Sequence, residues 1–239
     1  MLRDDRTASL AGLPFDRRVA LQTAPPRPPG RWLVLCDRGP VGRQVADALR
    51  DRGEEVIRVA RFDPARPPHR QGPAEVVVRP EAAGELAALV EAADTVDRPL
   101  VGVVHLWLLD PLPLDDRAPT ESPRPLEELA RRSGVLALTA ALDRHRARSR
   151  LWLVTRGALP ADAGRPAPDQ RLMWSLGRVL GVAHPELEPT LVELDPARPV
   201  GEGAAALMRV VTAAPRHRRL ATRRQCWFLP SVTAEARAA

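Results

Sequence analysis

The stretch LWLVTRGALPADAGRPAPDQRLMWSLGRVLGVAHPELEPTLVELD, residues 151–195, contains the pattern that decides the fold. It begins with an apolar strand-like run at 151–158 and continues through a Pro/Gly/Ala-rich loop into a helical pattern at 170–186. A second strand-like run follows at 190–195. A strand, a crossover helix and a strand of the same direction form a βαβ unit, and such units build parallel sheets. The stretch therefore predicts an α/β fold.

The helix of this unit has recognisable ends and two regularly spaced glycines. Asp169 is a plausible N-cap, and Pro185 ends the helical pattern. Gly177 and Gly181 lie four residues apart and therefore on one side of the helix. Without side chains at these positions, the helix can approach the sheet or another domain closely.

An earlier part of the chain has the same order of elements. The run RWLVLCD at 31–37 is short and continuously apolar, which is typical of a central parallel strand. A helical pattern follows up to Gly53, which is placed as a C-terminal cap, and a further strand-like run lies at 55–60. In a Rossmann domain, the turn between such a strand and its helix binds a pyrophosphate.

The turn departs from the pyrophosphate-binding fingerprint G-x-G-x-x-G. Only Gly39 and Gly42 are present, and Asp37 stands where the first glycine is expected. A carboxylate at that place would repel the bound anion, and Pro40 removes one backbone donor. The sequence therefore favours a vestigial turn that keeps the strand–helix corner over a working nucleotide site.

The other predicted elements complete an alternating pattern of strands and helices. The helix predicted in the second half of the sequence at 126–145 is interrupted by Gly134. The predicted strands and remaining helices lie at 75–79, 80–90, 99–107, 202–214, 219–222 and 225–229. Together with the two units above, they predict a mainly parallel sheet with helices on both faces.

One histidine, His105, lies inside the most strand-like run. A metal site needs several converging ligands, and the other histidines share no ligand spacing with it; they are His69, His145, His184 and His217. A hydrogen-bonded histidine at a strand end is therefore favoured over a metal ligand, and the sequence predicts no metal site.

The composition is that of a folded protein. The chain has 239 residues, 44% of them hydrophobic, and no apolar run approaches the ~20 residues of a membrane-spanning helix. The N-terminus carries acids and is followed by no apolar segment of the kind found in secretory signals. Cys36 and Cys226 are too few for a disulfide framework, so we expect a cytoplasmic protein.

The positive charge does not by itself indicate a nucleic-acid partner. The formal net charge is +6 and the sequence pI is about 11.0. The chain contains no lysine, and its arginines are spread among 30 acidic residues; only 215–224 forms a basic cluster. We therefore expect neither nucleic-acid nor membrane binding, and steep salt-dependent association would be the signature of the former.

Several strings resemble one known family. The strings LWLVTRGA, WSLGRVLGVAHPEL and TLVELD within 151–195, together with GVVHLWLLD at 102–110, resemble the structural subdomain of a ketoreductase from a modular type I polyketide synthase. That resemblance implies a truncated Rossmann fold that binds no cofactor. It also implies a partner, the catalytic subdomain, which binds NADPH and reduces the β-keto group of a chain carried by an acyl carrier protein.

The residue types in the chain agree with a non-catalytic role. In the family, the reductase uses a tyrosine to protonate the substrate oxygen and a lysine to lower the pKa of that tyrosine, and this chain has neither residue type. The resemblance therefore implies a scaffold that stabilises the catalytic subdomain and contacts neighbouring synthase domains, in cis or in trans. It also places the end of the chain about where the catalytic half or an inserted domain would begin.

Two alternatives and three interface residues complete the interpretation. The chain could instead be a pseudo-ketoreductase scaffold beside a methyltransferase or enoylreductase domain. A self-sufficient NAD(P)-binding oxidoreductase is disfavoured by the degenerate turn and the absence of tyrosine and lysine. In the related enzymes, the helix at 170–186 lies toward the junction with the catalytic subdomain, so the resemblance makes Trp174, Arg178 and His184 interface candidates.

The sequence divides into three parts. Residues 1–30 are rich in proline and arginine and predict a connector, with a possible edge strand at 15–21. Residues 31–230 form the predicted Rossmann-like domain, and residues 231–239 form a flexible tail.

Overall fold

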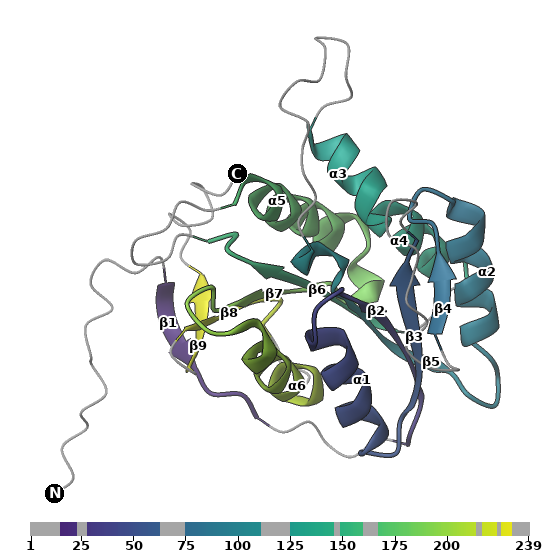
Figure 1. Ribbon diagram of the computed structural model, residues 1–239, viewed down its shortest axis with the longest axis horizontal. Coiled ribbons are helices and arrows are strands. Elements are labelled where there is room, and N and C mark those ends of the chain that lie inside the picture. Colours follow the sequence, from purple (N-terminus) through teal and green to yellow (C-terminus); the bar gives the residue numbers. More distant parts are fainter. Residues whose placement is uncertain are drawn as a thin grey trace, which may run out of the picture.

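The structure of the chain is a computed structural model, which describes residues 15–22, 28–62, 75–110, 125–145, 149–159, 167–213, 217–223 and 226–230. The described residues contain a nine-stranded sheet with helices on both faces (Figure 1). The strands are β1 (Phe15–Val19), β2 (Arg31–Cys36), β3 (Glu55–Arg61), β4 (Glu75–Val78), β5 (Leu100–His105), β6 (Arg150–Arg156), β7 (Thr190–Leu194), β8 (Arg219–Arg223) and β9 (Cys226–Pro230).

The described residues also contain six α-helices and three short 3₁₀ helices, which lie between these strands. The α-helices are α1 (Val41–Arg50), α2 (Ala83–Ala93), α3 (Pro125–Ser133), α4 (Val135–Arg144), α5 (Pro168–Ala183) and α6 (Gly203–Ala213). The 3₁₀ helices are η1 (Trp107–Leu109), η2 (Pro185–Leu187) and η3 (Val200–Glu202). Among the described residues, no helix is both long and apolar enough to cross a membrane.

The strand order is that of a doubly wound sheet with an antiparallel edge. The order is β1-β9-β8-β7-β6-β5-β2-β3-β4, and β2 to β8 are parallel to one another. β9 is antiparallel to both β8 and β1, which confirms the predicted edge strand. From β2 the chain continues to β3 and β4, which lie on one side of β2 in the sheet. It then returns to β5 on the other side of β2 and continues outward through β6 and β7 to β8. The order therefore reverses between β2 and β5, where open α/β sheets bind their ligands.

Both faces of the sheet are covered, so its central strands are buried on both sides. In β2, Leu33 and Leu35 pack with α2 to α5, whereas Trp32 and Val34 pack with α1 and α6 on the other face. Figure 1 shows α1 and α6 side by side on one side of the sheet. This double burial explains why β2 reads as a continuous apolar run. The βαβ unit predicted at 151–195 is confirmed as β6, α5 and β7, with β6 and β7 adjacent and parallel.

One predicted detail of the helices is confirmed and another is wrong. Gly134 interrupts the helical stretch expected at 126–145, as predicted: its φ of +67°, a left-handed conformation, ends α3 and separates it from α4. Asp169 is not an N-cap: α5 begins one residue earlier at Pro168, and Ala167 is the cap residue. Proline fits the first helical position because its fixed φ is already helical and its missing N–H is not needed there.

The two glycines of α5 have different surroundings, and this gives a test of its packing. A Cβ at Gly177 would overlap the side chain of Leu191 on β7, whereas a Cβ at Gly181 would meet no atom within 4 Å. We expect Gly177→Ala to lower the free energy of unfolding by about 1–3 kcal/mol through overpacking. Gly181→Ala should raise it by about 0.5–1 kcal/mol, because alanine favours the helix. Urea denaturation of both variants measures the difference, and a stabilised Gly177→Ala variant would contradict this packing of α5 on β7.

The predicted division into three parts is only partly covered by the described residues. β1 lies within the predicted connector, but residues 1–14 and 23–27 of that connector lie outside the described residues. The predicted tail, 231–239, lies wholly outside them.

Candidate functional site

The turn between β2 and α1 lies at the carboxyl edge of the sheet, next to the point where the strand order reverses. Asp37 in this turn is 7% exposed, and its Oδ1 accepts a hydrogen bond from the backbone N–H of Gly42 at 2.6 Å. The N–H of Val41 also donates to this carboxylate. Burial raises the pKa of Asp37, while these backbone donors oppose the rise. The carboxylate thus accepts hydrogen bonds from the first N–H groups of α1. In a nucleotide-binding turn of another protein, the equivalent N–H groups face the pyrophosphate.

The two glycines of the turn serve its internal packing. A Cβ at Gly39 would lie 2.6 Å from Oδ2 of Asp37, so the absence of a side chain makes room for that carboxylate. A Cβ at Gly42 would lie 2.7 Å from the Cα of Cys36, so Gly42 lets α1 approach the end of β2. Gly42 therefore keeps the helix–strand packing role of the last fingerprint glycine, whereas Gly39 accommodates a side chain of the protein itself.

A second carboxylate, Asp110, joins the ends of three neighbouring strands. It follows β5 and η1, and its Oδ1 accepts a hydrogen bond from the backbone N–H of Arg38 at 2.9 Å, just beyond β2. Its Oδ2 lies 3.6 Å from the guanidinium of Arg61, the last residue of β3, and both side chains are nearly buried. Burial raises the pKa of Asp110, and the negative charge of Asp37 acts in the same direction. Two acids of the protein therefore lie where a Rossmann domain would bind an anionic cofactor.

A third carboxylate, Glu193, is fully buried near the carboxyl end of β7. Its Oε2 accepts a hydrogen bond from the Thr155 hydroxyl at 2.6 Å, and its Oε1 accepts bonds from the N–H groups of Gly157 and Ala158 at 2.7 and 3.0 Å. The guanidinium of Arg223 on β8 lies 3.6 Å away. Burial raises the pKa of Glu193, while Arg223 and the hydrogen-bond donors oppose the rise. Glu193 therefore fixes the chain after β6 and links β6, β7 and β8.

His105 is a structural residue at the end of β5, as predicted. It is fully buried, and its Nε2–H donates a hydrogen bond to the carbonyl oxygen of Ser133 at 2.9 Å. Its ring packs edge-on against Trp107, with the ring centroids 5.6 Å apart. Burial lowers the pKa of His105 from 6.5 to about 4, so the imidazole is neutral near pH 7.

The lowered pKa of His105 predicts a loss of stability in mild acid. As the pH falls, the unfolded chain takes up this proton near pH 6.5, whereas the folded chain takes it up only near pH 4. The free energy of unfolding should therefore fall across this window, by about 2 kcal/mol at pH 5 relative to pH 7.5. His105→Gln keeps an N–H donor at the ε position but has no titrating group. The part of the fall in the free energy of unfolding that comes from His105 should therefore be missing in this variant. Equal pH slopes for the two proteins, measured by urea denaturation, would contradict a buried neutral His105.

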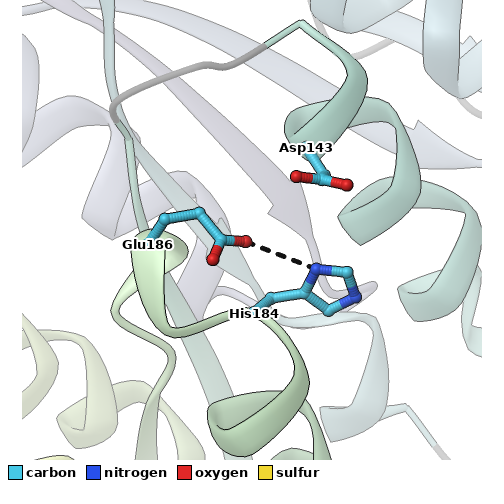
Figure 2. A group of neighbouring side chains, drawn as sticks. All are labelled: Asp143, His184 and Glu186. Carbon is cyan, nitrogen blue, oxygen red and sulfur yellow. Dashed lines mark ion pairs between the residues drawn. The ribbon is translucent and has the colours of Figure 1, made fainter.

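The three predicted interface residues have different environments. Trp174 is fully buried in the core, so it does not offer its side chain to a partner, and the prediction that it lies at an interface is wrong. Its place in the helical pattern could not distinguish a core face from an exposed one, because α5 has apolar residues on several sides. Arg178 is exposed, and His184 is half-buried at the C-cap of α5, close to Asp143 and Glu186 (Figure 2).

Two groups of buried polar residues at the carboxyl edge of the sheet were not predicted from the sequence. Glu193 interrupts an apolar strand, and an acid in such a run signals buried partners. Arg61 and Asp110 gave no such signal. Arg61 ends β3 and Asp110 follows η1 as ordinary charged residues, and their pairing depends on the strand order.

The curated relatives of the chain are polyketide synthases. No family model matches the chain. It is 33% identical over 192 residues to the pikromycin polyketide synthase component PikAIII of Streptomyces venezuelae, and the match covers 77% of this chain and 9% of that protein. It is 30% identical over 174 residues to the polyketide synthase GfsA of Streptomyces halstedii, covering 69% of this chain and 2% of that protein. The chain thus spans less than a tenth of the length of these relatives.

The solved structures that resemble the chain include ketoreductases and short-chain dehydrogenases. An A-type ketoreductase from a modular polyketide synthase superposes with a TM-score of 0.55 at 26% identity, covering 88% of this chain and 40% of that one. A C2-type ketoreductase gives a TM-score of 0.58 at 23% identity, covering 87% and 41%. An NRPS module that contains a ketoreductase gives 0.70 at 14% identity, covering 90% and 18%. The last two comparisons show the shared Rossmann-like fold alone. With modular polyketide synthases as its homologues and their ketoreductases as its structural neighbours, the chain is a ketoreductase-related domain of the modular polyketide synthase type.

Proposed function

We propose that this chain is the non-catalytic structural subdomain of a polyketide synthase ketoreductase. In this role it stabilises a separate catalytic subdomain, which binds NADPH and reduces the β-keto group of a polyketide attached to an acyl carrier protein. The observation that carries the proposal is the absence of both tyrosine and lysine from all 239 residues. The chain therefore cannot supply the tyrosine that protonates the substrate oxygen in this type of reductase, or the lysine that lowers the pKa of that tyrosine.

The turn at the carboxyl edge of the sheet supports the assignment of NADPH to the partner. The Asp37 carboxylate already accepts the hydrogen bond of the Gly42 N–H, and Asp110 adds a second acid nearby. A pyrophosphate would have to displace Asp37 and lie beside both acids, which is electrostatically unfavourable. The residues at this turn therefore do not fit the cofactor.

The exposed side of α5 is the surface we assign to the partner. Arg178, Val179 and Val182, here called the α5 patch, lie on neighbouring turns of the helix. Val179 is 58% exposed and Val182 is 85% exposed, although α5 buries the opposite side in the core. Exposed valines flanked by an arginine are suited to a protein interface, in which apolar contacts lie beside a charged rim.

A binding experiment with two matched variants tests this proposal. A ketoreductase catalytic subdomain without its own structural half is titrated with the 239-residue chain, and complex formation is followed by calorimetry. We expect Val182→Asp to weaken the complex at least tenfold, because it places a charge in an apolar contact. Val96→Asp changes a valine outside the patch that is even more exposed than Val182, and it should leave the affinity unchanged. Absence of a complex with the unaltered chain would contradict the scaffold function, whereas equal affinities for both variants would contradict the α5 patch alone.

A further inference from the structure

Three side chains with metal-ligating groups meet at the C-terminal ends of α4 and α5 (Figure 2). Asp143 is in the last turn of α4, His184 is the C-cap of α5, and Glu186 lies in η2. One ligand atom of each residue lies within 4.8 Å of the other two, and Nδ1 of His184 is 3.3 Å from Oε1 of Glu186. Figure 2 shows both carboxyl groups on the same side of the imidazole ring as Nδ1. Residues 41 positions apart in the sequence thus form one cluster. The cluster precedes β6 and β7, at the amino ends of these strands, whereas the β2–α1 turn follows the carboxyl end of β2.

The donor set suits a transition-metal cation. One imidazole nitrogen and two carboxylate oxygens are ligands that Zn²⁺ accepts, with a water molecule in the fourth position. In a tetrahedral site with bonds of about 2.1 Å, ligand atoms lie roughly 3.4 Å apart. The separation of 3.3 Å between His184 and Glu186 already matches this value. Asp143 is exposed, so a side-chain rotation can bring its carboxylate to the same separation.

The electrostatic surroundings favour a cation at this place. Helix C-termini carry partial negative charge, which is unfavourable for a nearby carboxylate. Asp143 and Glu186 nevertheless lie beside two such ends, at α4 and α5. Other surface carboxylates of the chain pair with arginines; examples are Glu128, Glu188 and Glu202. Within the ranges that the structure describes, no arginine forms an ion pair with Asp143 or Glu186.

We propose that Asp143, His184 and Glu186 form a binding site for a divalent transition-metal ion of the Zn²⁺ class. The ion would neutralise two carboxylates and join the end of α4 to the corner between α5 and η2. Its binding would therefore stabilise the folded chain, because a ligand that binds the folded state shifts the folding equilibrium. The proposal is independent of the scaffold function, since the ligands come from this chain alone.

Zinc titration of the tag-free chain tests the proposal. We expect saturable binding of one Zn²⁺ near neutral pH by calorimetry and a rise of the melting temperature with zinc concentration. His184→Ala removes the only nitrogen ligand of the cluster and should weaken zinc binding about tenfold or more. Losing a direct ligand should cost at least as much affinity as losing a residue that only hydrogen-bonds to a ligand. Asp143→Asn and Glu186→Gln should weaken it in the same direction.

The matched control changes a histidine outside the cluster. His217→Ala should leave both the zinc affinity and the zinc-induced rise of the melting temperature unchanged, because His217 is not part of the cluster. Absence of saturable zinc binding would overturn the proposal. Equal zinc affinities for the unaltered chain and His184→Ala would also overturn it, since the ion would then be held by other groups, such as Cys36 or Cys226.

Discussion

Replacing Trp174 by alanine is expected to lower the free energy of unfolding by about 3–5 kcal/mol. The indole is fully buried between α5 and the sheet, in the core cluster that also contains Met173 and Leu191. Truncation would remove one of the largest buried side chains of this core cluster and leave a cavity that the surrounding side chains can fill only in part. Guanidinium denaturation, followed by circular dichroism, measures the loss.

Two further variants show whether this loss arises from packing. Trp174→Phe keeps most of the ring volume and should lose much less stability than the alanine variant. Arg178→Ala, one turn further along the same helix but on its exposed side, should change the stability by no more than about 0.5 kcal/mol. If Trp174→Ala instead weakened binding to a catalytic subdomain while its stability stayed normal, Trp174 would lie at an interface and not in the core.

Replacing Glu193 by alanine is expected to cost about 3–5 kcal/mol, because it breaks a buried ion pair from one side. The change would remove the Glu193 carboxylate from the buried guanidinium of Arg223 and leave the N–H groups of Gly157 and Ala158 without this acceptor. Buried groups that lose their partners keep the full cost of desolvation. Thermal and urea denaturation of the variant measure this loss.

Milder changes separate the parts of the Glu193 network. Thr155→Val has nearly the same shape and removes one hydroxyl donor, so it should cost about 1 kcal/mol. Glu193→Gln keeps one acceptor oxygen but brings an NH₂ group toward the donors, so its cost should lie between those of the other two variants. A Glu193→Ala variant as stable as the unaltered chain would show that Glu193 has no role in holding β6, β7 and β8 together.

The elements that the sequence predicted well are those whose signal is local. β2 and β6 are continuous apolar runs because both faces of the sheet are covered, and α5 and β7 follow β6 within one stretch of chain. The altered turn at Asp37 was also predictable, since a fingerprint is a matter of residue type and spacing. The start of α5 was harder, because Pro168 acts through a backbone angle that a hydrophobic pattern does not contain.

The parts that could not be predicted depend on which segments become neighbours. Glu193 contacts Thr155 and Arg223 because β7 lies between β6 and β8, and this order is a property of the whole sheet. The cluster of Asp143 and His184 likewise requires α4 and α5 to end at the same place. Trp174 was assigned to the wrong side of α5 because apolar residues occur around most of that helix.

Calorimetric titration of the isolated chain with NADPH, repeated after addition of a ketoreductase catalytic subdomain, tests the scaffold function most directly. We predict no saturable heat of NADPH binding for the chain alone, because Asp37 occupies the donors of the β2–α1 turn. We also predict complex formation when the catalytic subdomain is added, with NADPH binding by that complex. Saturable NADPH binding by the chain alone would contradict the scaffold and would make the turn from Asp37 to Gly42 a working cofactor site.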